Sequence, residues 1–179
     1  MIYFDNAATT RVKPDVVMTA FLDYMRDIGV SPGRGSYSLG IQASRMLFQS
    51  RKTVASFFGA KQKTNVVFTK NSTEAINLYL SGILQPGDHV LISSYEHNAV
   101  LRPLHTLKQK GVIDYTILPE SVFDNPEVEL KRYIKPTTKL AAITLASNLT
   151  GQLVFNNRFS SLRLIHLTIV HMPSSECPQ

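Results

Sequence analysis

The chain has 179 residues, of which 44% are hydrophobic and 18% charged, so it can bury a core and is not expected to be disordered. Its net charge of +6 comes from scattered lysines and arginines, without the basic runs of a nucleic-acid-binding segment, so a solvated basic surface is the simpler interpretation. The absence of a transmembrane run, of a visible signal peptide and of any cysteine besides Cys177 predicts a cytoplasmic protein without membrane attachment or internal disulfides.

The first part of the chain predicts an arm and two helices. Residues 2–4 form a short extended start, and residues 1–13 as a whole are typical of an N-terminal arm. A helix is predicted at 14–28, with Pro14 in its first turn and Gly29 just past its end. After a glycine-rich loop, apolar residues at helical spacing predict a second helix at 39–58.

The rest of the chain alternates between predicted strands and helices. In order, we predict a strand at 65–69, a helix at 72–84, a strand at 89–93, a helix at 99–110, a strand at 113–118, a helix at 126–134 and a strand at 138–145. Strands joined by helices of this length predict an α/β fold with a mainly parallel sheet and helices on both faces. Ligands bind such sheets beyond the carboxyl ends of the strands.

Polar residues gather at those strand ends. Asn71, Ser72, Thr73 and Glu74 join a strand to a helix, where Asn71 and Glu74 can form a capping box. The free N–H groups of that first helical turn and the hydroxyls of Ser72 and Thr73 could instead bind an anion. The local pattern leaves both interpretations open.

Two further polar side chains follow strands. His97 could stack on a flat ring, act as an acid or base, or serve only as a helix-start residue. No metal site is predicted, because His89, His97 and His105 lack ligand spacing and cysteine partners. Asn148 could donate to a ligand oxygen or simply form a turn.

In combination these segments resemble the class V aminotransferases, in particular the cysteine desulfurase and selenocysteine lyase branch. The matching segments, in family order, are residues 3–10, 31–37, 67–69, 71–78, 86–90, 96–98 and 146–151. The resemblance covers residues 1 to about 154. It implies that residues 14–154 are an incomplete large domain of a fold-type-I transferase that depends on pyridoxal 5′-phosphate (PLP), usually a homodimer.

The resemblance also implies roles for individual residues. Ser72 and Thr73 would hold the cofactor phosphate, and His97 would stack on the pyridine ring as the catalytic residue of this part of the protein. Asn148 would contact the cofactor or substrate near the ring oxygen. The segment Asn6, Ala7 and Ala8 would line the substrate side.

The loop around Arg34 would reach toward the partner subunit's site, although on its own it is typical of a surface loop. The implied reaction removes sulfur or selenium from cysteine or selenocysteine and leaves alanine. A related class V aminotransferase with another amino-acid substrate, a noncatalytic folded remnant that binds phosphate or free PLP, and an unrelated phosphate-binding α/β domain are the alternatives.

Residues 155–179 do not match the family. The chain has no lysine after Lys139 and no aspartate after Asp124, whereas the family needs a later lysine to hold the cofactor and an aspartate to pair with its ring nitrogen. Phe155 stands where a proline is expected, and the composition after it resembles out-of-frame translation. We therefore expect an N-terminal fragment that is inactive alone, and no catalytic role for Cys177.

Overall fold

The structure of the chain, a computed structural model, describes residues 2–3, 6, 9–60, 66–147, 149–151 and 153–154, and only the backbone of Glu127. The chain divides into two compact units, residues 1–68 and 69–179, and each is described by itself. In the described part of the chain, no helix has the length and apolar character needed to cross a membrane.

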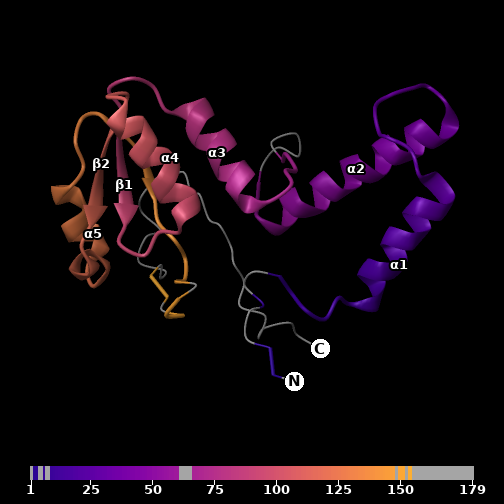
Figure 1. Cartoon of the computed structure of the whole chain (residues 1–179), viewed down its shortest axis with the longest axis horizontal. Coiled ribbons are helices and arrows are strands. Elements are labelled where there is room, and N and C mark those ends of the chain that lie inside the picture. Colours follow the sequence, from indigo (N-terminus) through magenta and orange to yellow (C-terminus); the bar gives the residue numbers. More distant parts are fainter. Residues whose placement is uncertain are drawn as a thin grey trace. The chain divides into compact units, whose positions relative to one another are not determined.

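The first unit consists of helices (Figure 1). The predicted helix at 14–28 is confirmed as α1 (Asp15–Asp23), which continues into a π-helical turn, η1 (Tyr24–Ile28). Pro14 lies at the N-cap, and Gly29 ends the helix in a left-handed conformation with φ of 56°. The second predicted helix is confirmed as α2 (Ser38–Phe57).

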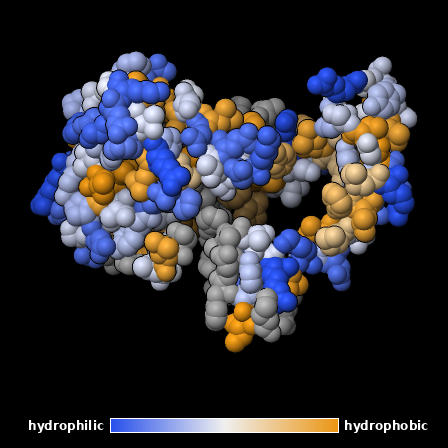
Figure 2. All heavy atoms as spheres, in the orientation of Figure 1, coloured by the Kyte–Doolittle hydropathy of each residue, from blue (hydrophilic) through white to orange (hydrophobic). Residues whose placement is uncertain are grey.

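Helix α1 leaves its apolar side chains at the surface. None of its residues is buried, and Val16, Phe21 and Leu22 are each more than half exposed. Figure 2 shows these apolar side chains gathered over α1. An apolar surface of this kind is typical of a contact site with further protein.

The second unit contains a parallel sheet (Figure 1). Its helices and strands, in order, are α3 (Ser72–Ile83), β1 (His89–Ser93), α4 (Asn98–Gln109), β2 (Asp114–Leu118), η3 (Glu120–Phe123), α5 (Pro126–Glu129), η4 (Leu130–Arg132) and β3 (Thr138–Ala142). The strand order is β2-β1-β3, and β1 pairs in parallel with both neighbours. The predicted mainly parallel sheet is therefore confirmed.

Both faces of this sheet are covered. Every residue of β1 is buried, and successive side chains of a strand point to opposite faces. Val90 and Ile92 pack in one cluster with residues of α3 and α4, including Leu80 and Leu104. Leu91 packs in a second cluster with residues of the η3–η4 segment. The expectation of helices on both faces is thus also confirmed.

Four predicted elements differ from the structure, and the first three are as follows. Residues 66–69 form no strand, and Val67 and Phe68 are 66% and 48% exposed, because a strand needs a hydrogen-bonded neighbour and none of the described strands pairs with them. Residue 65 lies outside the described part. The helix predicted at 126–134 is α-helical only to Glu129 and continues as a 3-10 turn. Residues 2 and 3 form no regular element.

The strand predicted at 138–145 ends at Ala142. Beyond it, the Thr144 N–H donates to the Glu96 carboxylate at 2.6 Å rather than to a neighbouring strand. A short antiparallel bridge between Ala146 and Leu153 follows. The chain therefore leaves the sheet as soon as β3 has paired with β1.

A buried histidine joins the three strands. His89 is 1% exposed, and its Nδ1 and Nε2 atoms lie 2.8 Å from Thr138 Oγ1 and 2.9 Å from Thr116 Oγ1. Burial lowers the pKa of His89, and the positive charge of Lys135 lowers it further. The ring is therefore a neutral cross-link between β1, β2 and β3.

Candidate cofactor site

The N-terminus of α3 has the predicted capping box. The Glu74 N–H donates to Asn71 Oδ1 at 2.8 Å, and the Glu74 carboxylate accepts from the Lys70 N–H at 2.7 Å. The Glu74 carboxylate therefore accepts from the residue that precedes the N-cap, and not from the N–H of the N-cap residue Asn71. Because its own N–H is already bonded, an anion at this helix end would meet the amides of Ser72 and Thr73 only, which corrects the expectation that the whole first turn is free.

We expect replacement of Asn71 with alanine to lower the free energy of unfolding by about 1 kcal/mol, because the Glu74 N–H would lose its acceptor. Asn71→Asp keeps an acceptor oxygen and is the matched control. Urea unfolding followed by circular dichroism measures the difference. Equal losses in the two variants would contradict the capping role.

His97 lies at the start of helix α4, the second helix of the site. It is the N-cap of α4, and its Nδ1 atom accepts from the Ala99 N–H at 3.0 Å. In the neutral ring the proton is consequently on Nε2. The imidazole is exposed, so capping occupies one nitrogen and leaves the ring face and the Nε2–H available to a ligand.

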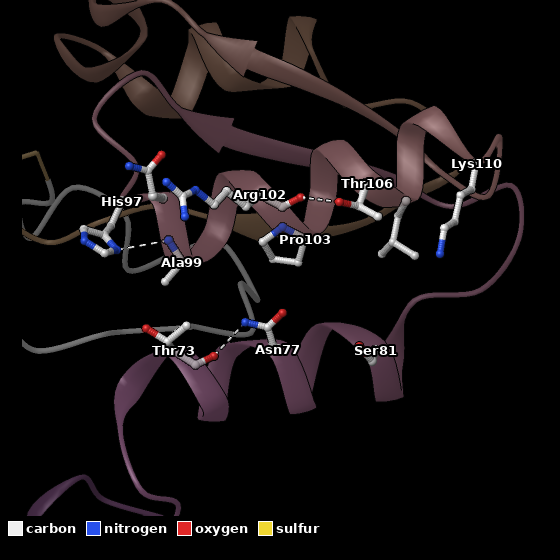
Figure 3. A pocket seen from close by; sticks show the side chains of 11 residues that line it. Thr73, Asn77, Ser81, His97, Ala99, Arg102, Pro103, Thr106 and Lys110 are labelled. Atoms are coloured by element: carbon white, nitrogen blue, oxygen red, sulfur yellow. Dashed lines mark hydrogen bonds between the residues drawn. The ribbon is translucent and has the colours of Figure 1, made fainter.

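Thr73 and His97 line the same groove between α3 and α4, which has a volume of about 560 Å3. Figure 3 shows the two side chains near one end of it, with Lys110 at the other. The groove is lined by Thr73, Asn77, Ser81, His97, Asn98, Ala99, Arg102, Pro103, Thr106, Leu107 and Lys110. No carboxylate is among these described residues, so the groove favours an anionic ligand.

Sequence analysis missed most of this lining. Thr73, Asn77 and Ser81 recur every four residues, which places them on one side of α3. Arg102 and Thr106 on α4, and Lys110 at its C-cap, follow at the same interval. This spacing of polar residues was the signal, but only the structure shows that the two polar sides face the same groove.

None of the other predicted site residues that the structure describes lines this groove. Ser72 is the exposed first residue of α3 and does not line the groove. Ala7, Ala8 and Asn148 lie outside the described residues. Asn6 and Arg34 belong to the first unit. The side chain of Asn6 accepts from the Arg11 N–H at 3.2 Å, and the roles toward cofactor and substrate stay predictions.

Glu96, next to His97, also escaped the sequence analysis. Its Oε1 atom accepts from the Ser93 hydroxyl at 2.5 Å and from the Thr144 N–H at 2.6 Å. Burial raises the pKa of Glu96, and these two hydrogen bonds oppose the shift.

The described residues contain no group of three His, Cys, Asp or Glu side chains able to hold a metal ion.

The chain belongs to the class V aminotransferase family, whose model matches residues 2–166. Among curated proteins it is 33% identical over 156 residues to a probable cysteine desulfurase of Vibrio cholerae, covering 84% of this chain and 38% of that protein. It is 34% identical over 153 residues to a probable cysteine desulfurase of Methanothermobacter thermautotrophicus, covering 84% and 37%. The chain thus spans less than two fifths of the length of these relatives.

Solved structures support the same family. The apo cysteine desulfurase of Thermococcus onnurineus is 32% identical, with a TM-score of 0.68 over 82% of this chain and 37% of that one. The cysteine desulfurase CsdA of Escherichia coli is 31% identical, with a TM-score of 0.62 over 84% and 39%. The fold class is accordingly confirmed as part of the fold-type-I architecture of PLP-dependent transferases.

Proposed function

We propose that this chain supplies the phosphate end and one ring face of a PLP site in an enzyme similar to the cysteine desulfurases. The observation that carries the proposal is the shared groove: Thr73 and His97 come from different helices and line one cavity. A volume of about 560 Å3 is in the ordinary range for small-molecule sites. The relatives named above support the choice of cofactor and reaction.

The side chains present fit a flat ring with a phosphate tail. The Thr73 hydroxyl and the amides of Ser72 and Thr73 would donate to phosphate oxygens, since the capping residue Asn71 occupies only the Glu74 N–H. Arg102 adds positive charge to the groove. The imidazole face of His97 would pack on the ring, while its bond to the Ala99 N–H fixes its orientation.

When bound, PLP would withdraw electrons from the amino-acid substrate. The residues of this chain would hold the phosphate, support the ring and keep a proton on His97 Nε2. Cysteine is the proposed substrate, with alanine as product. Selenocysteine or another amino acid is the alternative within the family, and Asn6, Ala7, Ala8, Arg34 and Asn148 keep their proposed contacts with substrate and cofactor.

A noncatalytic unit that binds phosphate or free PLP is the second candidate. It is favoured by the groove itself, in which Arg102, Lys110 and the N-terminus of α3 suit an anion without any covalent attachment. Alanine release from L-cysteine in the presence of dithiothreitol, which reduces the released sulfur to sulfide, is compared with a PLP-only control and distinguishes the two candidates. This candidate expects no release from the 179-residue chain, whereas turnover abolished by His97→Ala would support catalysis.

We also propose that the protein forms a homodimer in the cytoplasm. The partner would cover apolar side chains such as Val16, Phe21 and Leu22, which α1 leaves at the surface. Sedimentation of the purified chain tests this. A monomer at all concentrations would count against the dimer and would leave the cofactor proposal untouched.

PLP titration of the purified chain tests the cofactor site. We expect Thr73→Ala to weaken binding about tenfold or more, because a hydrogen bond to a charged group contributes about 1.5–3 kcal/mol. We expect His97→Ala to weaken it about threefold to tenfold, from lost ring packing. The change in PLP absorbance on binding is the measurement.

The matched control is Ser81→Ala, which removes a hydroxyl from the same side of α3 two helical turns further on. This variant should bind PLP as the unchanged chain does. If Thr73→Ala and Ser81→Ala behaved alike, the phosphate would not be held at the N-terminus of α3.

A further inference from the structure

In the described part of the chain, β1 and β3 do not pair with each other past their carboxyl ends. β1 ends at Ser93 and β3 at Ala142, and the ladder between them stops at the pair Ile92–Ala142. The segment that follows β1 carries His97, and the segment that follows β3 carries Ser147 and Asn148. Some other contact must fix their separation if both serve one ligand.

The Glu96 carboxylate is such a contact. A single oxygen, Oε1, accepts one hydrogen bond from Ser93 in its own segment and one from the Thr144 N–H in the other segment. The distances of 2.5 and 2.6 Å are those of strong charge-assisted hydrogen bonds. Within the described residues no lysine, arginine or histidine forms an ion pair with Glu96, so these bonds stabilise the partly buried charge.

Each end of this link continues toward a predicted ligand contact. On one side, Glu96 directly precedes His97, whose ring is held by the Ala99 N–H. On the other side, the Thr144 hydroxyl donates to the Ala146 carbonyl at 3.2 Å. Ser147 Oγ then accepts from the backbone N–H groups of Leu149 and Thr150.

We propose that Glu96 is a positioning residue: its carboxylate ties the His97 segment to the Thr144–Ser147 segment and so sets the spacing of the cofactor contacts. This inference rests on the proposed function of His97 and Asn148. Glu96 does not line the groove, so it acts through its neighbours and does not touch the ligand. This role requires an acceptor oxygen at the position of Oε1, which a glutamine carbonyl also supplies.

Amide hydrogen exchange on the full chain, followed by NMR, tests the link. We expect Glu96→Ala to speed exchange of the Thr144 amide about tenfold or more relative to the amide of Leu91 in β1, because its acceptor is lost. The Ala99 amide, bonded to the His97 ring, should also exchange faster. Glu96→Gln keeps a carbonyl oxygen and should restore both.

PLP affinity is measured in parallel, at a temperature where each variant is fully folded. It should fall about threefold or more in Glu96→Ala and recover in Glu96→Gln, while Glu120→Ala, an exposed carboxylate of the same unit, changes nothing. Uniformly faster exchange across the unit would reduce Glu96 to a structural residue and overturn the proposal. Unchanged Thr144 or Ala99 exchange in Glu96→Ala would overturn it as well.

The two proposals fail in different ways. A chain that binds no PLP but shows the expected exchange at Thr144 and Ala99 would contradict the cofactor site and leave the link between the segments intact. A chain that binds PLP normally with Glu96→Ala would contradict the positioning role and leave the cofactor site intact.

Discussion

Replacement of Leu104 with alanine is expected to lower the free energy of unfolding of the second unit by about 2–5 kcal/mol. The Leu104 side chain is 0% exposed and lies in the cluster between the sheet and helices α3 and α4. Its loss would leave a cavity that backbone elements on both sides keep from collapsing. Small domains are stable by only about 5–15 kcal/mol, so this change removes a large part of the total.

Urea unfolding of the purified variant, followed by circular dichroism, gives the measurement. Leu78→Ala on α3 is the control, because that leucine is 59% exposed and its truncation removes little buried area. A loss of similar size in both variants would show that the cluster does not form as described. The groove between α3 and α4 would also be affected by Leu104→Ala, since α4 forms one of its walls.

Acidification is expected to destabilise the second unit through His89. Its pKa is lowered in the folded state, mainly by burial, so below the ordinary value of about 6.5 the unfolded chain takes up a proton that the folded chain resists. The stability is therefore complete above about pH 6.5 and is lost as the pH falls through the folded pKa. Between the two pKa values the slope approaches about 1.4 kcal/mol per pH unit.

Unfolding measured from pH 7.5 to 5 should thus show a decline that His89→Gln reduces. Glutamine can still donate to and accept from the Thr116 and Thr138 hydroxyls but does not titrate. Leu78→Ala, a substitution at an exposed side chain that does not titrate, should keep the pH dependence of the unchanged chain. Parallel curves for the chain and for His89→Gln would contradict the role of His89.

The parts of the fold predicted correctly from the sequence are those with strong local signals. Helix α3 follows from the capping residue Asn71 and its apolar spacing, and β1 from the apolar residues at 90–92. The strand expected at 65–69 has similar composition, yet residues 66–69 do not pair, because pairing depends on a partner elsewhere in the chain. Local composition cannot supply that partner.

In the candidate site, too, local sequence patterns indicate some residues, whereas others depend on contacts between distant segments. Thr73 and His97 were predicted as site residues because each follows a predicted strand near the start of a helix, within segments that resemble the class V aminotransferases. The bond from the Thr144 N–H to Glu96 joins residues far apart in the sequence, and no local pattern marks it. The facing polar sides of α3 and α4 likewise depend on how two helices pack, which the sequence of either helix does not determine.

The strand order has a consequence for synthesis on the ribosome. β1 is translated before both strands that flank it, although it is the central strand of the sheet. Its five buried residues have no hydrogen-bonded neighbour until β2 is made, and their second edge stays open until β3 follows. The nascent chain therefore carries β1 unpaired through the translation of α4, and with one open edge through that of η3, α5 and η4, an interval in which a chaperone that holds extended apolar segments would find it accessible.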